Sequence, residues 1–283
     1  MLSNIARVGE IAYTPAVMTS PAIEPTPSSP ALADGLPTVS VIIPIWNDAE
    51  QLRAVLTVLS SIENILEIIV GDASDGPECR QIAEAAGATV VICTAPSRGK
   101  QMNAAAALAR GDVLIFQHAD TETSQAHIDS LRKTMANENI IGGGYYRRFN
   151  PHHRSRRWME PWIRRINRHS TIWGDQSMFV RRSHFKRLGG FAPIPLFEDA
   201  DLSKRLRRSG RVALIDPPMW SSARRHKAYG SWRASFEIFC VVQLYRLGVS
   251  PFWLHRVYYR LRKKGRQGPP VEAEVGLHRD PAV

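Results

Sequence analysis

Short apolar runs alternate with helix-like segments from Val39 to Phe116, and this order constrains the fold more than any other feature of the sequence. The runs are predominantly apolar, as expected of strands that are buried on both faces of a sheet. They lie at residues 39–43, 67–72, 89–94 and 112–116, and helical segments at 49–62, 77–87 and 99–111 separate them. Strands joined by helices predict an α/β fold with a mostly parallel sheet and helices on both faces.

In a parallel sheet of this kind, ligands bind beyond the carboxyl ends of the strands, near the point where the strand order reverses. The predicted strands place four loops at that edge, at residues 44–48, 71–76, 96–101 and 117–123. We therefore expect functional residues in these loops.

Composition divides the chain into four parts. Residues 1–37 are rich in Pro, Ser and Ala without periodicity, which predicts a disordered extension before a folded domain at 38–230. Residues 231–267 mix aromatic side chains with arginines, which suits helices that either lie in a membrane interface or pack onto the domain. Residues 268–283 are predicted to be a flexible tail, and no run reaches the roughly 18 apolar residues that span a bilayer.

The net charge of +11 is concentrated in two basic stretches. Residues 147–168 hold eight arginines against one acid, and residues 224–266 hold eleven Lys and Arg against one acid. Such a surface prefers nucleic acid, acidic lipid headgroups or phosphorylated small molecules, although a solvated basic face has the same composition. The three cysteines match no zinc or redox spacing, which favours reduced thiols and a cytoplasmic protein.

The first two loops carry polar groups that suit a nucleotide. Pro44 and Asn47 follow the first strand, and Asp72 ends the second within the sequence "GDASDG". A carboxylate there can accept hydrogen bonds from a base N–H or a ribose hydroxyl. The same letters fit a simple β-turn, so this loop alone leaves both interpretations open.

Arg98 and Lys100 flank Gly99 at the predicted start of the third helix. Free backbone N–H groups and the helix dipole favour an anion at that end, so two cations beside them indicate a phosphate site. The glycine pattern of a P-loop is missing, and an exposed pair of cations without a ligand is the alternative interpretation.

The fourth strand runs directly into His118, Ala119 and Asp120, in the sequence "IFQHADT". Because burying a carboxylate without a partner is unfavourable, we expect Asp120 to face a cation that bridges the phosphates of a bound nucleotide. A helix cap at Asp120 or Thr121 is the alternative.

The second half of the domain differs in character. A glycine run followed by aromatic and basic residues at 141–150 suits a backbone that passes close to another group. Trp173, Asp175 and Gln176 then precede the strand-like sequence "SMFV", as candidates for acceptor binding or a secondary role.

Three acids crowd the first turn of a predicted helix in "PLFEDADLSKRLRRSG": Glu198, Asp199 and Asp201. Acids at the start of a helix and bases at its end complement the macrodipole, which explains part of the pattern. Three carboxylates within four residues also indicate a general base that deprotonates a sugar or lipid hydroxyl.

The order of these motifs resembles that of the family 2 glycosyltransferases, enzymes of the Rossmann-like GT-A fold that transfer a sugar from a nucleotide-activated donor with inversion. The resemblance runs from about Val39 to about Gly230 and is carried, in the expected order, by "VSVIIPIWN", "EIIVGDASDG", "SRGKQMNAAAALARGD", "IFQHADT", "GDQSMFVRR", "GGF" and "PLFEDADLSKRLRRSG". Within the family the sequence is most similar to a bacterial subgroup with "RGKQMN", "HADT" and "EDxDL"-type motifs, whose acceptors are generally unassigned.

The resemblance implies a donor site made from the first three loops. Asp72 matches the acid that contacts the nucleotide base, and Pro44 and Asn47 line the same pocket. Arg98 and Lys100 would approach the diphosphate.

The resemblance also implies the groups that carry the chemistry. Asp120 matches the metal-contacting acid of the family's Asp-x-Asp motif, for Mg²⁺ or Mn²⁺. Asp199 matches the aspartate proposed as catalytic base, with Glu198 beside it. Asp201 is assigned with the acceptor or secondary residues.

The sequence departs from the family pattern at two positions. His118 stands where the commoner motif has its first Asp, and its imidazole could hydrogen-bond the ribose or assist a metal with one negative charge fewer. Gly71 replaces an acid that often precedes the base-contacting aspartate.

His226 could reach the diphosphate or metal, and a surface or core histidine is the alternative.

The sequence therefore predicts an inverting glycosyltransferase that uses a nucleotide-sugar and a divalent metal on a lipid or saccharide acceptor, at the inner face of the cell membrane. A nucleotidyltransferase of similar fold is the nearest alternative, but "PIWNDAE" stands where it would have a glycine-rich, basic loop. A nucleic-acid-binding protein is suggested by charge alone, with "RRFNPHHRSRRW" as its one candidate segment, and we expect no nucleic-acid partner. A catalytically inactive relative that binds nucleotide-sugars is a further alternative, because of His118.

Overall fold

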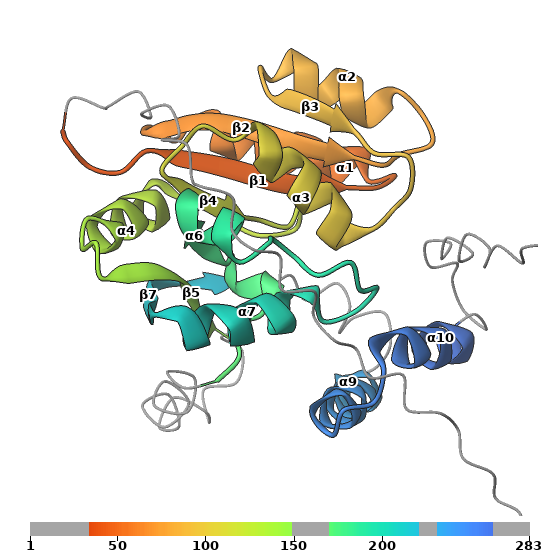
Figure 1. The fold of residues 1–283 in the computed structure, drawn as a ribbon. Coiled ribbons are helices and arrows are strands. Elements are labelled where there is room, and N and C mark those ends of the chain that lie inside the picture. The colour runs from red at the N-terminus through yellow and green to blue at the C-terminus, as the bar shows by residue number, and fades with distance from the viewer. Residues whose placement is uncertain (1–33, 149–169, 221–230, 263–283) are drawn as a thin grey trace, which may run out of the picture.

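The structure is a computed structural model that describes residues 34–148, 170–220 and 231–262 (Figure 1). Several expectations concern other parts of the chain and lie outside the described residues. They are those for residues 1–33, for most of the basic stretch 147–168, for His226 and for the tail at 268–283.

Seven strands form one sheet in the order β3-β2-β1-β4-β6-β5-β7. Their bounds are β1 Val39–Ile45, β2 Ile65–Asp72, β3 Thr89–Ile92, β4 Val113–Phe116, β5 Ile140–Arg148, β6 Phe179–Arg181 and β7 Arg211–Trp220. Of these described strands, β6 alone runs antiparallel to its neighbours β4 and β5, and the remaining pairs are parallel. The mostly parallel sheet predicted from the sequence is therefore confirmed.

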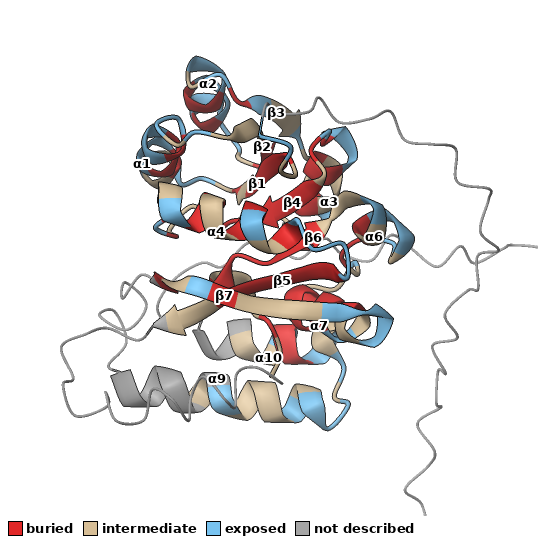
Figure 2. Ribbon diagram, turned by 90° about the vertical axis from the view of Figure 1, so that its left-hand side faces the viewer, coloured by how far each residue is buried: buried red, intermediate tan, exposed pale blue. Residues whose placement is uncertain are grey.

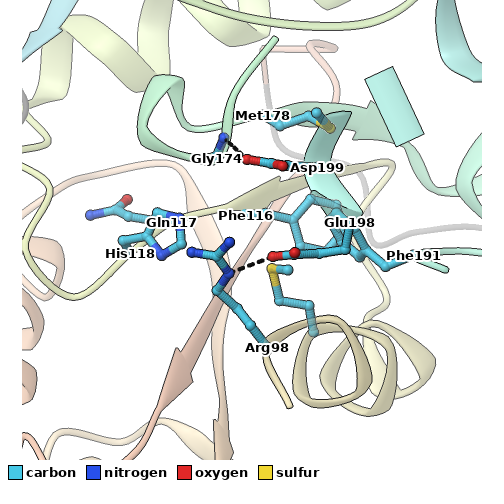
Figure 3. Close-up of a pocket in the computed structure, with 10 residues that line it drawn as sticks. Arg98, Phe116, Gln117, His118, Gly174, Met178, Phe191, Glu198 and Asp199 are labelled. Carbon is cyan, nitrogen blue, oxygen red and sulfur yellow. Dashed lines mark hydrogen bonds and ion pairs between the residues drawn. The ribbon is translucent and has the colours of Figure 1, made fainter. Parts of the chain in front are cut away.

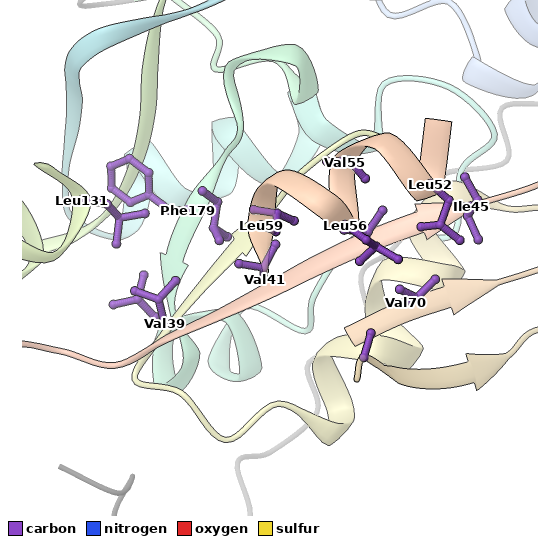
Figure 4. Packing of buried hydrophobic residues seen from close by; sticks show 14 of the residues in the cluster. Val39, Val41, Ile45, Leu52, Val55, Leu56, Leu59, Val70, Leu131 and Phe179 are labelled. Atoms are coloured by element: carbon purple, nitrogen blue, oxygen red, sulfur yellow. The ribbon is translucent and has the colours of Figure 1, made fainter. Parts of the chain in front are cut away.

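Helices cover both faces of this sheet, as predicted (Figure 1). They are α1 Ala49–Leu59, α2 Glu78–Ala85, α3 Arg98–Leu108, α4 Gln125–Met135, α6 Arg182–Arg187 and α7 Glu198–Ser209. Alternate residues of β1 enter different cores: Val41 and Ile43 pack with α1, α2 and α4, whereas Ile42 packs with α3, α6 and α7. Figure 4 shows the first core, where apolar side chains of α1 lie over β1.

The carboxyl ends of three strands lie level with one another. Ile45 of β1 pairs with Asp72 of β2, and Asp72 pairs with Ile92 of β3. β4 stops short of this level, because its last residue, Phe116, pairs with Ile42, three positions before the end of β1. The loop after β4 therefore begins deeper in the sheet than its neighbours.

Helix α3 packs unusually close to the ends of β1 and β2. The buried Gln101 side chain donates from Nε2 to the carbonyl oxygens of Ile45 (2.7 Å) and Gly71 (2.9 Å). A Cβ atom on Gly71 would lie 2.7 Å from the carbonyl oxygen of Gln101. This close approach explains why a glycine stands directly before Asp72.

The glycine run at 142–144 has a similar explanation. These residues belong to β5, and a Cβ on Gly142 would lie 2.6 Å from the carbonyl oxygen of Phe179 in β6. A Cβ on Gly144 would lie 2.6 Å from the side chain of Ile172. The glycine run therefore passes close to other segments of the same polypeptide, namely β6 and the segment that contains Ile172.

The folded chain includes residues that we expected in the N-terminal extension. Arg132 of α4 is buried, and its guanidinium donates to both carboxylate oxygens of Asp34 at 2.7 Å. Its Nε also donates to the carbonyl oxygen of Pro37 at 3.0 Å. Residues 34–37 are therefore held against α4 by a bidentate ion pair and backbone contacts.

Two helices, α9 (Ser231–Arg246) and α10 (Pro251–Arg262), form the predicted C-terminal helical extension. In Figure 2 they lie beyond α7, away from the sheet. Leu254 and His255 of α10 are buried, whereas five large apolar side chains are exposed: Phe239, Leu244, Leu247, Phe252 and Trp253. None of the helices in the described part of the chain combines the length and apolar character needed to cross a bilayer.

Replacing Gly71 with alanine should destabilise the protein, because the new Cβ meets the backbone of α3 rather than a movable side chain. We expect the free energy of unfolding to fall by about 1–3 kcal/mol, as measured by urea denaturation. Gly76→Ala is the matched control, since nothing lies within 4 Å of a Cβ there. Equal stabilities of the two variants would contradict the close packing of α3.

Candidate active site

A pocket lies over the shortened end of β4, where α3, α7 and the turn η2 (Gly174–Gln176) meet (Figure 3). Groups from sequence segments far apart line it: Arg98, Met102, Phe116, Gln117, His118, Gly174, Met178, Phe191, Glu198 and Asp199. The lining side chains include four apolar ones together with two carboxylates, a guanidinium and an imidazole. This is the composition expected of a site that orients a polar substrate.

Arg98 and Glu198 join the first residues of two helices, α3 and α7. The Nε of Arg98 donates to Oε1 of Glu198 at 2.5 Å, and the Glu198 side chain is 2% exposed whereas that of Arg98 is 38% exposed. The buried carboxylate is thereby compensated, and the guanidinium extends from it toward solvent. Arg98 thus lies at the helix end that favours an anion, as predicted from its position.

Asp199 is buried and accepts two hydrogen bonds from the backbone. The N–H of Gly174 donates to Oδ2 at 2.7 Å, and the N–H of Ala200 donates to Oδ1 at 2.7 Å. Burial and the negative charge of Glu198 raise the pKa of the Asp199 carboxyl, while Arg98 and the two N–H groups act in the opposite direction. A carboxylate with a raised pKa is suited to accept a proton from a hydroxyl.

Gly174 lies between the side chains of His118 and Asp199. A Cβ at this position would be 2.6 Å from Nε2 of His118 and 3.2 Å from Oδ2 of Asp199. No larger residue fits here without displacing one of them. The imidazole that replaces the first acid of the metal motif is therefore in the same pocket as the predicted base.

An ion pair between Arg147 and Asp175 lies close to this carboxylate. Burial lowers the pKa of Arg147 to about 10, and the negative charge of Asp199 acts against that shift. Arg147 is thus within electrostatic reach of Asp199 from the end of β5. From the sequence, Arg147 is included only in the basic stretch at 147–168, because no local pattern distinguishes it from the other arginines there.

The ends of β1 and β2 are tied together by a separate network. The backbone N–H of Asn47 donates to Oγ of Ser74 at 2.9 Å. The Asn47 side chain donates from Nδ2 to the Asp75 carboxylate (2.6 Å) and accepts at Oδ1 from the Asp75 N–H (3.0 Å). Asp72 is buried and accepts from the N–H of Ser74 at 2.8 Å. The loop at 71–76 therefore forms a turn, as in the simpler interpretation, and also holds the buried carboxylate of Asp72 at the edge of the sheet.

The structure does not bring every predicted residue into the pocket. Pro44, Asn47 and Asp72 lie at the ends of β1 and β2, outside the pocket lining but at the same edge of the sheet. Lys100 is exposed on the first turn of α3, and Asp120 is half-buried two residues beyond His118.

Two further residues have contacts within the fold. Gln176 donates from Nε2 to the Tyr145 carbonyl oxygen (2.8 Å) and accepts from the Trp173 N–H (3.0 Å). Asp201 pairs with Arg205 one turn later, at 2.6 Å. Both contacts stabilise the elements that frame the pocket.

The fit of a metal depends on Asp120. Within residues 34–148, 170–220 and 231–262, no group of three or more His, Cys, Asp or Glu side chains is placed to hold a metal ion. A single half-buried carboxylate suits a hard cation that takes its other ligands from phosphate oxygens and water, which is how Mg²⁺ often binds. The residues therefore fit a metal that arrives with a diphosphate.

Comparisons with known proteins identify the sequence pattern and the fold. The family described as Glycosyl transferase family 2 matches residues 40–187, which is more than half of the chain. A search of curated proteins found no match.

Solved structures with this fold include a mannosyltransferase from Pyrobaculum calidifontis in complex with GDP-Man and Mn²⁺, at 21% identity and a TM-score of 0.61, covering 83% of this chain and 73% of that one. Glucosyl-3-phosphoglycerate synthase from Mycobacterium tuberculosis, with Mn²⁺, UDP and glucosyl-3-phosphoglycerate, has 19% identity and a TM-score of 0.53, covering 75% and 81%. Residues 1–349 of TarS from S. aureus with UDP-GlcNAc have 16% identity and a TM-score of 0.54, covering 66% and 59%. These likenesses show the fold.

Replacing Glu198 with Gln should lower the pKa of Asp199, because it removes the adjacent negative charge while Arg98 remains. The carboxyl signal of Asp199 in ¹³C NMR, assigned with Asp199→Asn, should then titrate at lower pH than in the parent protein. A base must be ionised to accept a proton, so the acid limb of any activity profile should move to lower pH as well. The exposed Glu84→Gln is the control, and an unchanged or higher pKa in Glu198→Gln would contradict the assignment.

Proposed function

Because the chain belongs to glycosyl transferase family 2, we propose that it transfers a sugar from a nucleoside-diphosphate donor to the hydroxyl of a lipid or saccharide acceptor, with inversion. One observation carries this proposal: Asp199 is buried with a raised pKa in a pocket that also holds Arg98 and His118. The pocket lies at the same edge of the sheet as Asp72, so a donor and a base can act together there.

The donor would extend along the carboxyl ends of the strands. Asp72 accepts from the base or ribose, with Pro44 and Asn47 beside it at the end of β1 and in the loop that follows. Arg98 and Lys100, on the first turn of α3, attract the diphosphate, whose charge the helix N-terminus also favours. In support, the similar structures named above hold GDP-Man, UDP or UDP-GlcNAc.

Asp120 would hold a divalent metal, Mg²⁺ or Mn²⁺, together with oxygens of the diphosphate. When bound, such an ion stabilises the negative charge that develops on the leaving nucleoside diphosphate. His118 lies two residues before Asp120, and its imidazole faces Gly174 beside Asp199. It is suited to hydrogen-bond the donor where the commoner motif has a carboxylate.

Asp199 would act as the general base. Its carboxylate accepts the proton of the acceptor hydroxyl as the hydroxyl oxygen forms a bond to the anomeric carbon. The bond from that carbon to the diphosphate breaks on the opposite side, and the diphosphate leaves with the electron pair, so the centre is inverted. Glu198 holds Arg98 at the site, and the N–H groups of Gly174 and Ala200 orient the base. Trp173, Asp175 and Asp201, on segments that frame the pocket, would bind or orient the acceptor.

The C-terminal helices would place the site at a membrane surface. The exposed apolar residues within α9 and α10 are Phe239, Leu244, Phe252 and Trp253, and the same helices carry the exposed Arg246 and Arg256. This combination suits an interface with anionic lipid. A cytoplasmic protein bound there would meet a lipid-linked acceptor at the inner face of the membrane.

Calorimetric titration with UDP-, GDP- and CDP-sugars, each with and without Mn²⁺, tests the donor site. We expect one donor to bind in a metal-dependent manner, and Asp72→Ala to weaken that binding. Asp199→Asn should bind the donor nearly as well as the parent protein but lose transfer, because the base acts on the acceptor. Folded protein that binds none of the donors would contradict the proposed function.

The membrane contact can be tested separately by flotation with lipid vesicles. We expect the protein to float with anionic vesicles, and the double variant Phe252→Ser/Trp253→Ser to float less, because half-exposed apolar rings are lost from the interface. Ile92→Ser, an exposed apolar residue on β3, is the matched control. Protein that stays unbound with every vesicle composition would contradict the contact.

A further inference from the structure

We propose that Tyr245, on α9, is a positioning residue that holds the catalytic carboxylate Asp199 in place through the ring of Phe197. The inference rests on the proposed function of Asp199 as base. Tyr245 lies outside residues 40–187, which match the family, so its role would belong to the C-terminal extension of this chain.

The backbone of Phe197 is in an unfavourable conformation directly before the two buried carboxylates. Its φ and ψ are 66° and 23°, in the left-handed region, although it has a bulky side chain. Such a conformation persists only where the surroundings enforce it, and it often marks a functional site. Because Phe197 is the N-cap of α7, its backbone sets the direction in which Glu198 and Asp199 leave the first turn.

Two aromatic rings hold the side chain of Phe197. The ring of Tyr245 stacks on it with centroids 4.5 Å apart and an interplanar angle of 23°. Trp173 contacts it edge-on, with centroids 6.3 Å apart. The contact with Tyr245 brings α9 against the start of α7, on the side seen below α7 in Figure 2.

Two members of this aromatic cluster, Phe197 and Trp173, are directly connected to Asp199 or to its hydrogen-bond donor. Phe197 is two residues before it in the chain, and Trp173 precedes Gly174, whose N–H donates to Oδ2 of Asp199. Loss of the Tyr245 ring would therefore loosen the helix start that carries the base and the turn that orients it. A small displacement of a catalytic group can lower the rate without affecting donor binding.

The hydroxyl of Tyr245 interacts electrostatically with three acids of α7. Burial raises its pKa, and the negative charges of Asp201, Asp199 and Glu198 act in the same direction, whereas Arg205 opposes them. The hydroxyl therefore stays protonated at neutral pH. The proposed role belongs to the aromatic ring, so a phenylalanine at this position should preserve it.

The test compares Tyr245→Leu, which removes the ring, with Tyr245→Phe, which keeps it. Leu247→Ser, an exposed residue on the turn after α9, is the control for a change in this region. The readouts are hydrolysis of the donor sugar, in which water replaces the acceptor, together with donor binding by calorimetry and the pKa of Asp199 by ¹³C NMR. Thermal unfolding verifies that each variant is folded.

We expect Tyr245→Leu to lower kcat by about tenfold to a hundredfold with little change in KM for the donor. The pKa of Asp199 should fall toward its ordinary value, because the loosened carboxylate becomes better solvated. Tyr245→Phe and Leu247→Ser should resemble the parent protein. In a double-mutant cycle, Phe197→Leu and Tyr245→Leu should be non-additive, because both remove the same contact.

Three results would overturn the inference: a Tyr245→Leu variant with the kcat and Asp199 pKa of the parent, an equal loss in Tyr245→Phe, or additive effects in the cycle. A parent protein that neither binds nor hydrolyses any donor would contradict the proposed function instead. The NMR comparison of Asp199 in the parent and Tyr245→Leu would still decide whether the ring holds the carboxylate.

Discussion

Two adjacent carboxylates, Glu198 and Asp199, are buried at the start of α7, and the rest of the site depends on how their charges are compensated. Buried charges are unfavourable unless each is paired or hydrogen-bonded. Arg98 of α3 compensates Glu198, while the N–H groups of Gly174 and Ala200 bind Asp199. These partners come from three separate segments, so the site exists only when α3, η2 and α7 meet at one edge of the sheet. Burial and the adjacent negative charge of Glu198 nevertheless raise the pKa of Asp199, which suits the proposed role of its carboxylate as a proton acceptor.

The sheet provides this meeting point through the unequal lengths of its strands. β1, β2 and β3 end level with one another, but β4 ends at Phe116, opposite Ile42. The chain that follows carries His118 into the pocket and leaves Asp120 half-buried, rather than fully buried within the sheet. A strand that runs straight into an acid is therefore compatible with the cost of burying a carboxylate.

Much of this arrangement could be predicted from the sequence, because it follows from local patterns. The apolar runs between Val39 and Phe116 predicted the four parallel strands, and the loops after them contain Asp72, Arg98 and His118. The strand β7 escaped prediction, because Asp216, Pro217 and Pro218 in its middle are typical of a turn. The glycines of β5 suggested a close approach, but only the neighbouring strands reveal what is approached. The contact of Phe197 with Tyr245 and the proximity of Arg147 to Asp199 join distant segments, and no local pattern encodes them.

In the proposed function, a nucleotide would lie across the ends of β1 and β2, with its diphosphate between Arg98 and a metal on Asp120. The most direct measurement is a crystal structure with UDP or GDP and Mn²⁺, in which anomalous scattering locates the manganese. We predict a manganese peak at the carboxylate of Asp120, in contact with the diphosphate, and the base of the nucleotide beside Asp72. A nucleotide or manganese ion bound elsewhere on the protein, with these residues uncontacted, would contradict the account.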